Sequence, residues 1–251
     1  PESFRDYVGR LLGFDLNDPQ GAMLCVNFGL SELSMSLASE CWQTLHVRRL
    51  ARTNAELSTA LFGQESGLLP CLMQYFPPAT YLEAGEAADG KARLVVTMLD
   101  PRRKLPMIRY STGDIAKEIS YVELVHVLER FGLGALIPPA RLPMIALWGK
   151  SPSLDLPGQG RILADSVKEA LYDCPEVARA CTGNFRINNQ PGHLRILIQR
   201  KEGAVISEDQ LTELHRLLVS RLGCPCEIMP FDFRGFPDGL DQDHQRKIRC
   251  I

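Results

Sequence analysis

Apolar positions recur along the chain with two different periods, and their alternation predicts helices and strands. SFRDYVGRLLG (3–13) carries apolar side chains at helical spacing and ends in glycine, which predicts an amphipathic helix. MLCVNF (23–28) is a continuous apolar run, typical of a strand buried on both faces. Between 79 and 99, two strand-like runs flank Asp89-Gly90, a strong hairpin signal. This part of the chain therefore mixes strands with helices.

The pattern continues through the middle of the chain. LPMIRY (105–110) predicts another strand, followed by a turn that ends on Asp114. EISYVELVHVLER (118–130) predicts a helix. Its expected inward positions are Ile119, Val122, Val125 and Leu128. The Gly- and Pro-rich residues 132–143, a strand-like MIALWGK and a polar segment after it predict a domain boundary near Trp148 to Ser153.

A smaller α+β unit is expected beyond this boundary. Asp165 is a candidate cap for one helix, and HLRILIQR (193–200) alternates as a strand does. Ser207 and Gln210 have capping-box spacing at the start of a leucine-rich helix, and CEIMPF (226–231) is expected as the last strand.

Composition narrows the function classes. The 251 residues are 45% hydrophobic and 23% charged with a net charge of -2, as in ordinary soluble globular proteins of one or two domains. We therefore expect no nucleic-acid or membrane partner. No apolar stretch reaches the roughly 18 residues that span a bilayer, and no signal peptide precedes the first helix, so a cytoplasmic location is expected. The eight cysteines are expected to be reduced and mostly buried.

Residues 27–32, NFGLSE, are the first candidate site. Glycine lets the backbone approach a phosphate, Ser31 can donate a hydrogen bond, and Glu32 can hold a hard cation such as Mg²⁺. Strand ends of this kind are where open α/β sheets bind ligands. The structural alternative is a strand-to-helix turn with Ser31 as the helix cap.

Two further candidates carry charge. Asp114, just past Gly113, can accept hydrogen bonds from vicinal hydroxyls such as those of a ribose; alternatively it pairs with Arg109 or caps a turn. Near the end, a basic cluster contains Lys247, whose ammonium can reach a developing charge on a phosphate. The structural alternative for this cluster is a solvated tail.

The order of these motifs resembles the adenylate-forming superfamily, and within it the phenylacetate-CoA ligases and the CapK-like proteins. FGLSE is followed by ASEC, LH, YLE, VVTMLD and LPMIRYSTGDIA, so that the resemblance is ordered from about residue 2 to 116 and weaker over 149–178. It implies an α/β fold: residues 1–148 would be the end of the large N-terminal domain, with mixed sheets and helices, and 149–251 the small mobile α+β C-terminal domain.

The resemblance also implies an activity. ATP would activate a carboxylic acid, with aromatic acids among the candidates, to an acyl-adenylate, and the acyl group would then pass to a thiol, usually coenzyme A. The implied site residues are Phe28 against adenine with Gly29 and Leu30 beside it, Ser31 at the α-phosphate, Glu32 on Mg²⁺, Asp114 on the ribose, Lys150 at the interdomain hinge and Lys247 for adenylation.

The chain departs from the family pattern in three places. Nothing in residues 1–27 resembles the family's phosphate loop, which favours a piece of a longer enzyme over a relative that has lost ATP turnover. Lys150 replaces an arginine and so loses a bidentate contact, and Pro152 replaces an acid, which leaves thiol transfer more doubtful than adenylation. Cys41 and His46 match half of a zinc site found in some relatives, but the second half is missing, so no zinc is expected.

Three functions stay open on the sequence. The first is an adenylate-forming acid-thiol ligase. The second is a nucleotide-binding or regulatory relative without turnover, and the third is an enzyme that hands the acyl group to a protein thiol. The acid, the thiol acceptor and the oligomeric state are not encoded in any motif.

Overall fold

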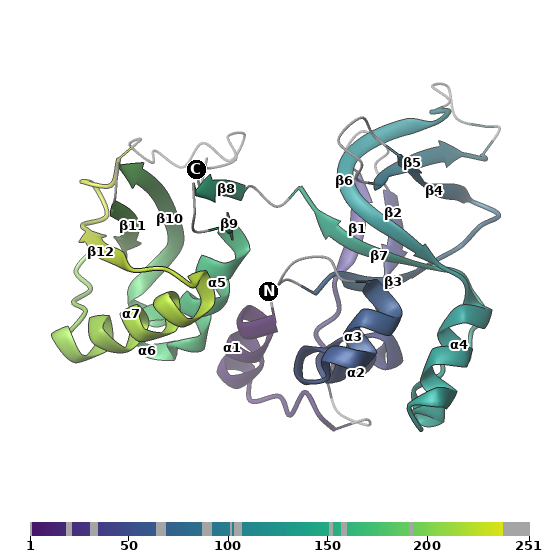
Figure 1. Ribbon diagram of the computed structural model, residues 1–251, viewed down its shortest axis with the longest axis horizontal. Helices are drawn as coiled ribbons and strands as arrows, with labels where there is room; N and C mark the ends of the chain where they lie inside the picture. Colours follow the sequence, from purple (N-terminus) through teal and green to yellow (C-terminus); the bar gives the residue numbers. More distant parts are fainter. Residues whose placement is uncertain are drawn as a thin grey trace. The chain divides into compact units, whose positions relative to one another are not determined.

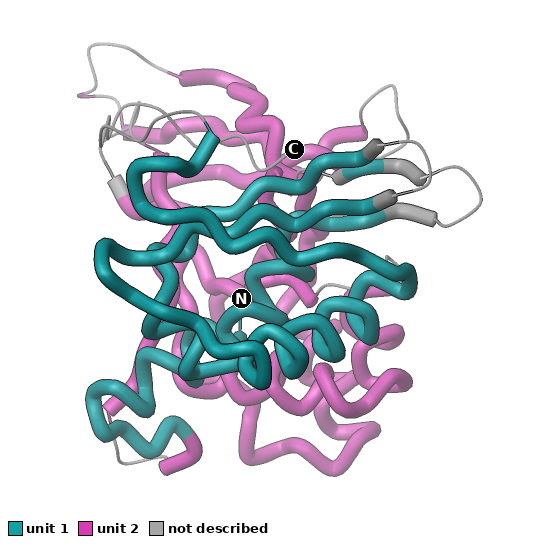
Figure 2. Tube along the Cα trace, turned by 90° about the vertical axis from the view of Figure 1, so that its left-hand side faces the viewer, with its two compact units in different colours: residues 1–16, 151–251 teal, residues 17–150 magenta. Residues whose placement is uncertain are grey.

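The computed structural model describes residues 2–18, 22–30, 35–63, 69–86, 92–100, 102, 107–150, 153–156, 160–190 and 193–237. The chain forms two compact units: one is Asn17–Lys150, and the other combines Pro1–Leu16 with Ser151–Ile251 (Figure 2). Over the described residues, no helix is both long and apolar enough to cross a membrane.

The Asn17–Lys150 unit is built on one large sheet. Its elements are β1 (Asn27–Leu30), β2 (Met35–Ser39), α2 (Trp42–Thr53), α3 (Ala55–Phe62), β3 (Cys71–Tyr75), β4 (Thr80–Glu86), β5 (Ala92–Met98), β6 (Tyr110–Ile119), α4 (Tyr121–Arg130), a 3-10 turn η2 (Gly134–Leu136) and β7 (Met144–Gly149). The described strands follow the order β1-β2-β3-β7-β6-β5-β4, and each neighbouring pair is antiparallel. The two strands of the predicted hairpin are confirmed as β4 and β5, which pair antiparallel. The Asp89-Gly90 turn on which that prediction depended lies outside the described residues.

The two faces of this sheet pack against different partners. On one face, a single hydrophobic cluster takes side chains from all seven described strands, from Phe28 on β1 to Leu82 on β4. On the other face, α2, α3 and α4 cover the central strands (Figure 1). Residues of β7 alternate between the clusters, with Ile145 in the first and Met144 in the second, so this strand is buried on both faces.

Two predicted elements differ from the structure. The run 23–28 is not a strand buried on both faces: Met23 is 41% and Val26 40% exposed, and β1 begins only at Asn27, at the edge of the sheet. The helix α4 buries Leu124 and Leu128, whereas Val122 is 67% exposed. The inward face of α4 therefore carries the leucines that pack on the hydrophobic cluster beneath the sheet, and not the β-branched Val122.

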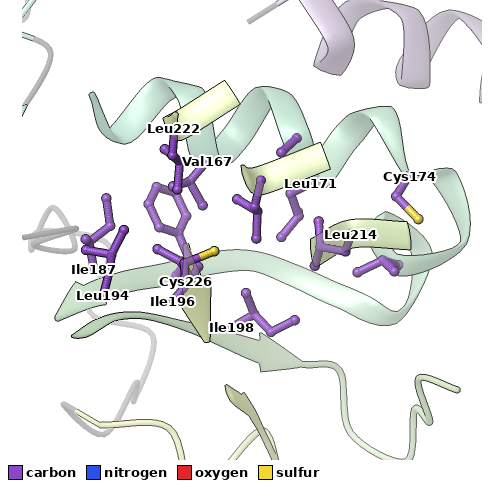
Figure 3. Close-up of a cluster of buried hydrophobic side chains, with 14 of the residues drawn as sticks. Val167, Leu171, Cys174, Ile187, Leu194, Ile196, Ile198, Leu214, Leu222 and Cys226 are labelled. Carbon is purple, nitrogen blue, oxygen red and sulfur yellow. The ribbon is translucent and has the colours of Figure 1, made fainter. Parts of the chain in front are cut away.

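The other unit combines a small sheet with helices. Its elements are α1 (Glu2–Leu12), β8 (Ser153–Leu156), β9 (Gly160–Leu163), α5 (Ala164–Asp173), α6 (Pro175–Ala180), β10 (Cys181–Gln190), β11 (His193–Arg200), α7 (Glu208–Leu222) and β12 (Cys226–Phe231). β10 and β11 are antiparallel, and β11 and β12 are parallel. Figure 3 shows the core between α5, α7 and this sheet, with Leu171, Leu214 and Ile196 among its members.

The ends of the helices in this unit test two capping predictions. Ser207 and Gln210 form the predicted capping box at the start of α7. Asp165, in contrast, is not a cap: the residue at the N-cap of α5 is Leu163, and Asp165 lies in the first turn.

The first helix belongs to this unit as well. Glu169 on α5 accepts hydrogen bonds from the backbone N–H groups of Glu2 and Ser3, at 2.8 and 3.0 Å, and from the Ser3 hydroxyl. The sequence placed residues 1–16 with the larger domain, whereas the compact units place them with residues 151–251. The assignment of the two units to a large and a small domain of an adenylate-forming enzyme stays a prediction.

Candidate functional site

Asp114 lies within a strand rather than at its end. The strand β6 runs from Tyr110 through Asp114 to Ile119, so the predicted turn after a strand is instead an irregularity inside one. Towards β5, Ser111 pairs with Val95 and Ile115 with Arg93, so that residues 112–114 lie opposite the single residue between Arg93 and Val95. Bulges of this kind redirect side chains and occur often beside active sites.

The register is also broken on the other side of β6. Ile115 pairs with Gly149 of β7, and the next residue, Ala116, pairs with Leu147, so Trp148 is an extra residue in β7. Asp114 therefore directly precedes Ile115, the residue at which the pairing of β6 with β5 and its pairing with β7 both change register. Two irregularities at one point leave a short length of the β6 backbone without regular ladder partners.

The Asp114 carboxylate has no partner within the described part of the chain. Its backbone N–H donates to Thr112 Oγ1 at 3.1 Å, and Gly113 takes a positive φ of 78° that favours glycine. The side chain is 8% exposed, yet no described residue donates a hydrogen bond to it. The proposed pairing with Arg109 is wrong, because Arg109 Nη1 pairs with Glu83 Oε1 at 2.8 Å.

Lys150 lies beside this bulge. A Cβ built on Gly113 would be 3.4 Å from Lys150 Cε and 3.9 Å from its Nζ, and a Cβ built on Gly149 would be 3.9 Å from Asp114 Oδ1. Gly149 has a positive φ of 75°. The two predicted residues Asp114 and Lys150, 36 positions apart in the chain, are thus brought together around two glycines. The site then combines a carboxylate acceptor with a nearby cation.

Arg93 is a residue of this site that the sequence did not point out. Its Nη1 lies 3.4 Å from the carbonyl oxygen of Gly113, across the β5–β6 ladder. The contact brings a second cation to the backbone of the bulge. No local motif marks Arg93; only the pairing of β5 with β6 could have identified it.

The other unit contains a second copy of the same local structure. In β10, Thr182-Gly183-Asn184 repeats the Thr-Gly-acid/amide order, the Asn184 N–H donates to Thr182 Oγ1 at 3.2 Å, and Gly183 has φ 90°. Here the final side chain is satisfied within the protein, because Asn184 Nδ2 donates to Gln199 Oε1 at 2.7 Å. Among the described residues Asp114 has no such partner, so its oxygens are not engaged by that part of the chain.

Phe28, Gly29 and Leu30 are placed differently from the prediction. They lie in β1, which pairs antiparallel with β2, so Gly29 is opposite Ser36 in a strand pair and not in a strand-to-helix turn. The argument from the ends of parallel strands also fails, because the large sheet is antiparallel. Phe28 and Leu30 are half-buried and pack on the cluster that contains Ala116 of β6.

Three predicted site residues fall outside the described residues. These are Ser31, Glu32 and Lys247. The assignments of the α-phosphate contact, the Mg²⁺ ligand and the adenylation lysine therefore stay predictions. Across the described ranges, no three His, Cys, Asp or Glu residues are grouped in a way that could hold a metal ion.

Two buried cysteines of the unit that contains Ser151–Ile251 are poor nucleophiles. Burial raises the pKa of Cys226 to about 11, and burial likewise raises the pKa of Cys181 to about 11 despite the opposing charges of Lys201 and Arg200. At neutral pH these thiols are protonated, and the thiolate is the reactive form. Of the candidate zinc ligands, His46 stacks on Trp42 with ring centroids 4.0 Å apart.

Comparison with known proteins gives a likeness of fold. No protein-family profile matches the sequence, and no curated protein matches it. Among solved structures, 2-hydroxyisobutyryl-CoA ligase in the postadenylation state with R3-HIB-AMP matches with a TM-score of 0.56 and 15% identity, over 99% of this chain and 44% of that one. The same ligase with 2-HIB-AMP matches with a TM-score of 0.55 and 13% identity, over 94% and 43%.

The chain thus spans less than half the length of the ligase that it matches. At this identity the likeness concerns the fold alone. It gives no support for the phenylacetate-CoA ligase or CapK branch. The described residues share the mixed α/β fold of part of an adenylate-forming CoA ligase.

Proposed function

We propose that this chain is part of an enzyme that activates a carboxylic acid with ATP and passes the acyl group to a thiol such as coenzyme A. The observation that carries the proposal is the Asp114 carboxylate, which is 8% exposed, accepts no hydrogen bond from the described residues and lies beside Lys150. The likeness of fold to a CoA ligase with a bound acyl-AMP supports the same reaction class.

The residues fit a nucleotide. A carboxylate held on a rigid strand can accept from both hydroxyls of a ribose, since an ionised carboxylate only accepts and has two oxygens for the task. The ammonium of Lys150 is a compact positive charge suited to a phosphate. In this proposal Phe28 lies against adenine, with Gly29 and Leu30 beside it, Ser31 faces the α-phosphate, and Glu32 binds Mg²⁺.

The reaction has two steps. A carboxylate oxygen of the acid attacks the α-phosphorus of ATP, and the bond to pyrophosphate breaks. The thiol sulfur then attacks the acyl carbonyl, loses its proton, and AMP leaves. Lys247 would stabilise the charge that develops during the first step, and one preorganised charge of this kind is worth about 3 to 4 kcal/mol. Neither step needs a nucleophile from this chain, in keeping with the raised pKa values of the buried thiols Cys181 and Cys226.

The finer identity of the enzyme is also a proposal. Ordered motifs favour the phenylacetate-CoA ligase and CapK-like branch, with an aromatic acid as a candidate substrate. Lys150 in place of an arginine favours the alternative of a nucleotide-binding relative without turnover, because a bidentate contact is lost there. Transfer to a protein thiol is the third possibility. It differs from the first in that a protein thiol, rather than coenzyme A, accepts the acyl group.

Exchange of radiolabelled pyrophosphate into ATP tests the proposal, with the full-length protein and a panel of aryl and fatty acids. We expect exchange with at least one acid. Lys247→Ala should slow the exchange by about two to three powers of ten, and Glu32→Gln should slow it and raise the Mg²⁺ requirement. Lys201→Ala, a change of an exposed lysine in the same unit, is the control.

Two outcomes would contradict different parts of this proposal. Absence of exchange with every acid, together with absence of AMP binding, would refute the ligase function. Retained AMP binding without exchange would favour the regulatory relative. Full exchange in Glu32→Gln or Lys247→Ala would refute the assignment of those residues alone.

A further inference from the structure

Thr112 has a hydroxyl hydrogen that the described part of the chain does not use. The residue lies on β6 and is 5% exposed, and its Oγ1 accepts a hydrogen bond from the Asp114 backbone N–H at 3.1 Å. A hydroxyl oxygen that accepts one bond can still donate its own hydrogen. The described residues provide no acceptor for that hydrogen and no donor for the Asp114 carboxylate. Thr112 and Asp114 thus present a buried donor and a buried acceptor, two positions apart.

The bulge of β10 shows what these two positions contact when their partner is part of the protein. Thr182 Oγ1 donates to Gln199 Oε1 at 2.8 Å, and Asn184 Nδ2 donates to the same oxygen at 2.7 Å. Gln199 is the single residue of β11 that lies opposite residues 182–184. The first and third side chains of this bulge therefore converge on one atom of the residue opposite them.

The bulge of β6 has the same backbone features but a different residue opposite it. In both bulges three residues face one, and the third N–H bonds to the threonine hydroxyl, at 3.1 Å in β6 and 3.2 Å in β10. Opposite residues 112–114 lies Leu94, which is fully buried in the hydrophobic cluster of the large sheet. A leucine side chain neither donates nor accepts hydrogen bonds. It cannot serve Thr112 and Asp114 as the glutamine serves the bulge of β10.

The chemistry of the two unpaired groups defines what they can bind together. An ionised carboxylate only accepts, so a group that binds Asp114 must donate a hydrogen. The hydroxyl of Thr112 already accepts from the backbone, so a group that binds it must accept. A hydroxyl group meets both conditions at one atom, whereas an ammonium only donates and a phosphate oxygen would be repelled by the carboxylate.

We propose that Thr112 is a specificity-determining residue of the nucleotide site, because it donates a hydrogen bond to the same ribose hydroxyl that donates to Asp114. This inference rests on the proposed function. A site built around a hydroxyl rejects a ligand that lacks it, since buried polar groups are then left unpaired. The shared hydroxyl is the 2′ or the 3′ hydroxyl of the ribose, and the deoxynucleotide that lacks it identifies which.

Two substitutions separate the hydroxyl of Thr112 from the shape of its side chain. Thr112→Val keeps the branched shape and removes the hydroxyl, whereas Thr112→Ser keeps the hydroxyl. Thr182→Val is the matched control, because it removes the same bond to a backbone N–H from a bulge whose polar groups are satisfied within the protein. Thr182→Val should lower the melting temperature at least as much as Thr112→Val does, and only Thr112→Val should weaken nucleotide binding.

Titration calorimetry of the full-length protein with AMP, 2′-deoxy-AMP and 3′-deoxy-AMP tests the shared hydroxyl. Thr112→Val should bind AMP about tenfold more weakly than the wild type, the ratio expected for one hydrogen bond, and Thr112→Ser should bind it nearly as well as the wild type. The deoxynucleotide that lacks the shared hydroxyl should bind equally to Thr112→Val and the wild type, because the contact is already lost. The other deoxynucleotide should keep the difference of about tenfold.

A role for Thr112 that is limited to holding the bulge predicts a different pattern. If the hydroxyl only fixed the position of Asp114, Thr112→Val would lower the affinity for both deoxynucleotides, because each keeps one hydroxyl that bonds to the carboxylate. That result would overturn the proposal. An unchanged affinity for AMP in Thr112→Val would overturn it too, as would an equal loss of AMP affinity in Thr182→Val.

Failure of the proposed function would look different from failure of this inference. A wild-type protein that neither binds AMP nor exchanges pyrophosphate with any acid would refute the ligase function and with it the role of Thr112. Normal binding and exchange in the wild type, together with an equal loss for all three nucleotides in Thr112→Val, would refute the role of Thr112 alone.

Discussion

At the scale of single residues, the two Thr-Gly-acid/amide bulges show how the same backbone can serve two purposes. In β10 the last side chain of the bulge is satisfied within the protein, because Asn184 donates a hydrogen bond to Gln199. In β6 the bulge leaves Asp114 largely shielded from water and without a donor among the described residues. Removing a carboxylate from water without a partner is unfavourable, so such a group marks a candidate for ligand binding.

Asp114→Asn should weaken binding of AMP by about 10- to 100-fold, because hydrogen bonds to a charged group are worth roughly 1.5 to 3 kcal/mol. The amide has nearly the same shape, so the fold should be kept. Titration calorimetry with AMP measures the affinity, and Ser111→Ala, an exposed change on the same strand, is the control. Equal affinity in both variants would show that Asp114 does not hold the nucleotide.

The type of residue at position 114 could be predicted as functional from sequence, but its surroundings could not. A carboxylate after glycine at the end of an apolar run suggested a turn. The structure shows a strand that continues to Ile119, because β7 pairs with β6 beyond the irregularity. The proximity of Lys150 depends on the same pairing, which joins residues distant in the sequence and leaves no local signal.

At the scale of elements, prediction succeeded where the determining contacts are local. The capping box of α7 and the hairpin of β4 and β5 depend on neighbours a few residues away. The run 23–28 was misjudged, because an apolar sequence does not reveal whether another strand covers it, and β1 lies at the sheet edge. The face of α4 was misjudged for a related reason: Val122 and Leu124 are both apolar, and only the packing partner selects one.

The packing of α4 gives a direct test at this scale. Leu124→Ala should destabilise the protein by about 2 to 5 kcal/mol, since Leu124 is fully buried and its removal leaves a cavity. Val122→Ala removes apolar atoms from the same helix at a site that is 67% exposed, and should change stability by less than about 0.5 kcal/mol. Urea denaturation compares the two. Equal losses would contradict the described face of α4.

At the scale of the whole molecule, the smaller sheet and its helices are completed by the start of the chain. The chain passes between its two compact units twice, after Leu16 and after Lys150. The contact that brings the first helix back is made by Glu169, which is 7% exposed. Burial alone would raise the pKa of Glu169, but hydrogen bonds from Ser3 and Glu2 together outweigh it and lower the pKa below its ordinary value.

A lowered pKa makes the docking of α1 dependent on pH. The contribution of Glu169 is complete above its unfolded pKa of about 4.3 and is lost as the pH falls through the lower, folded value. The protection of the α1 amides, which is their hydrogen-exchange rate relative to the intrinsic rate at the same pH, should therefore fall in acid. Glu169→Gln should accelerate this exchange about 10- to 100-fold already at pH 7 and remove this acid step.

An exposed glutamate in the same unit provides the control for this experiment. Glu208 lies in the first turn of α7, and Glu208→Gln should leave α1 exchange at the wild-type rate. If Glu169→Gln also left that exchange unchanged at pH 7, Glu169 would not be what holds the helix.

The docking of α1 also sets an order of events during synthesis. Ser3 bonds to a side chain 166 positions further along the chain. At about 5 to 20 residues per second, the ribosome needs roughly 8 to 33 seconds to add that stretch. For that time α1 has emerged without the helix on which it packs, and its apolar face is open to chaperones. The unit that contains α1 is thus completed only after the Asn17–Lys150 unit has been made.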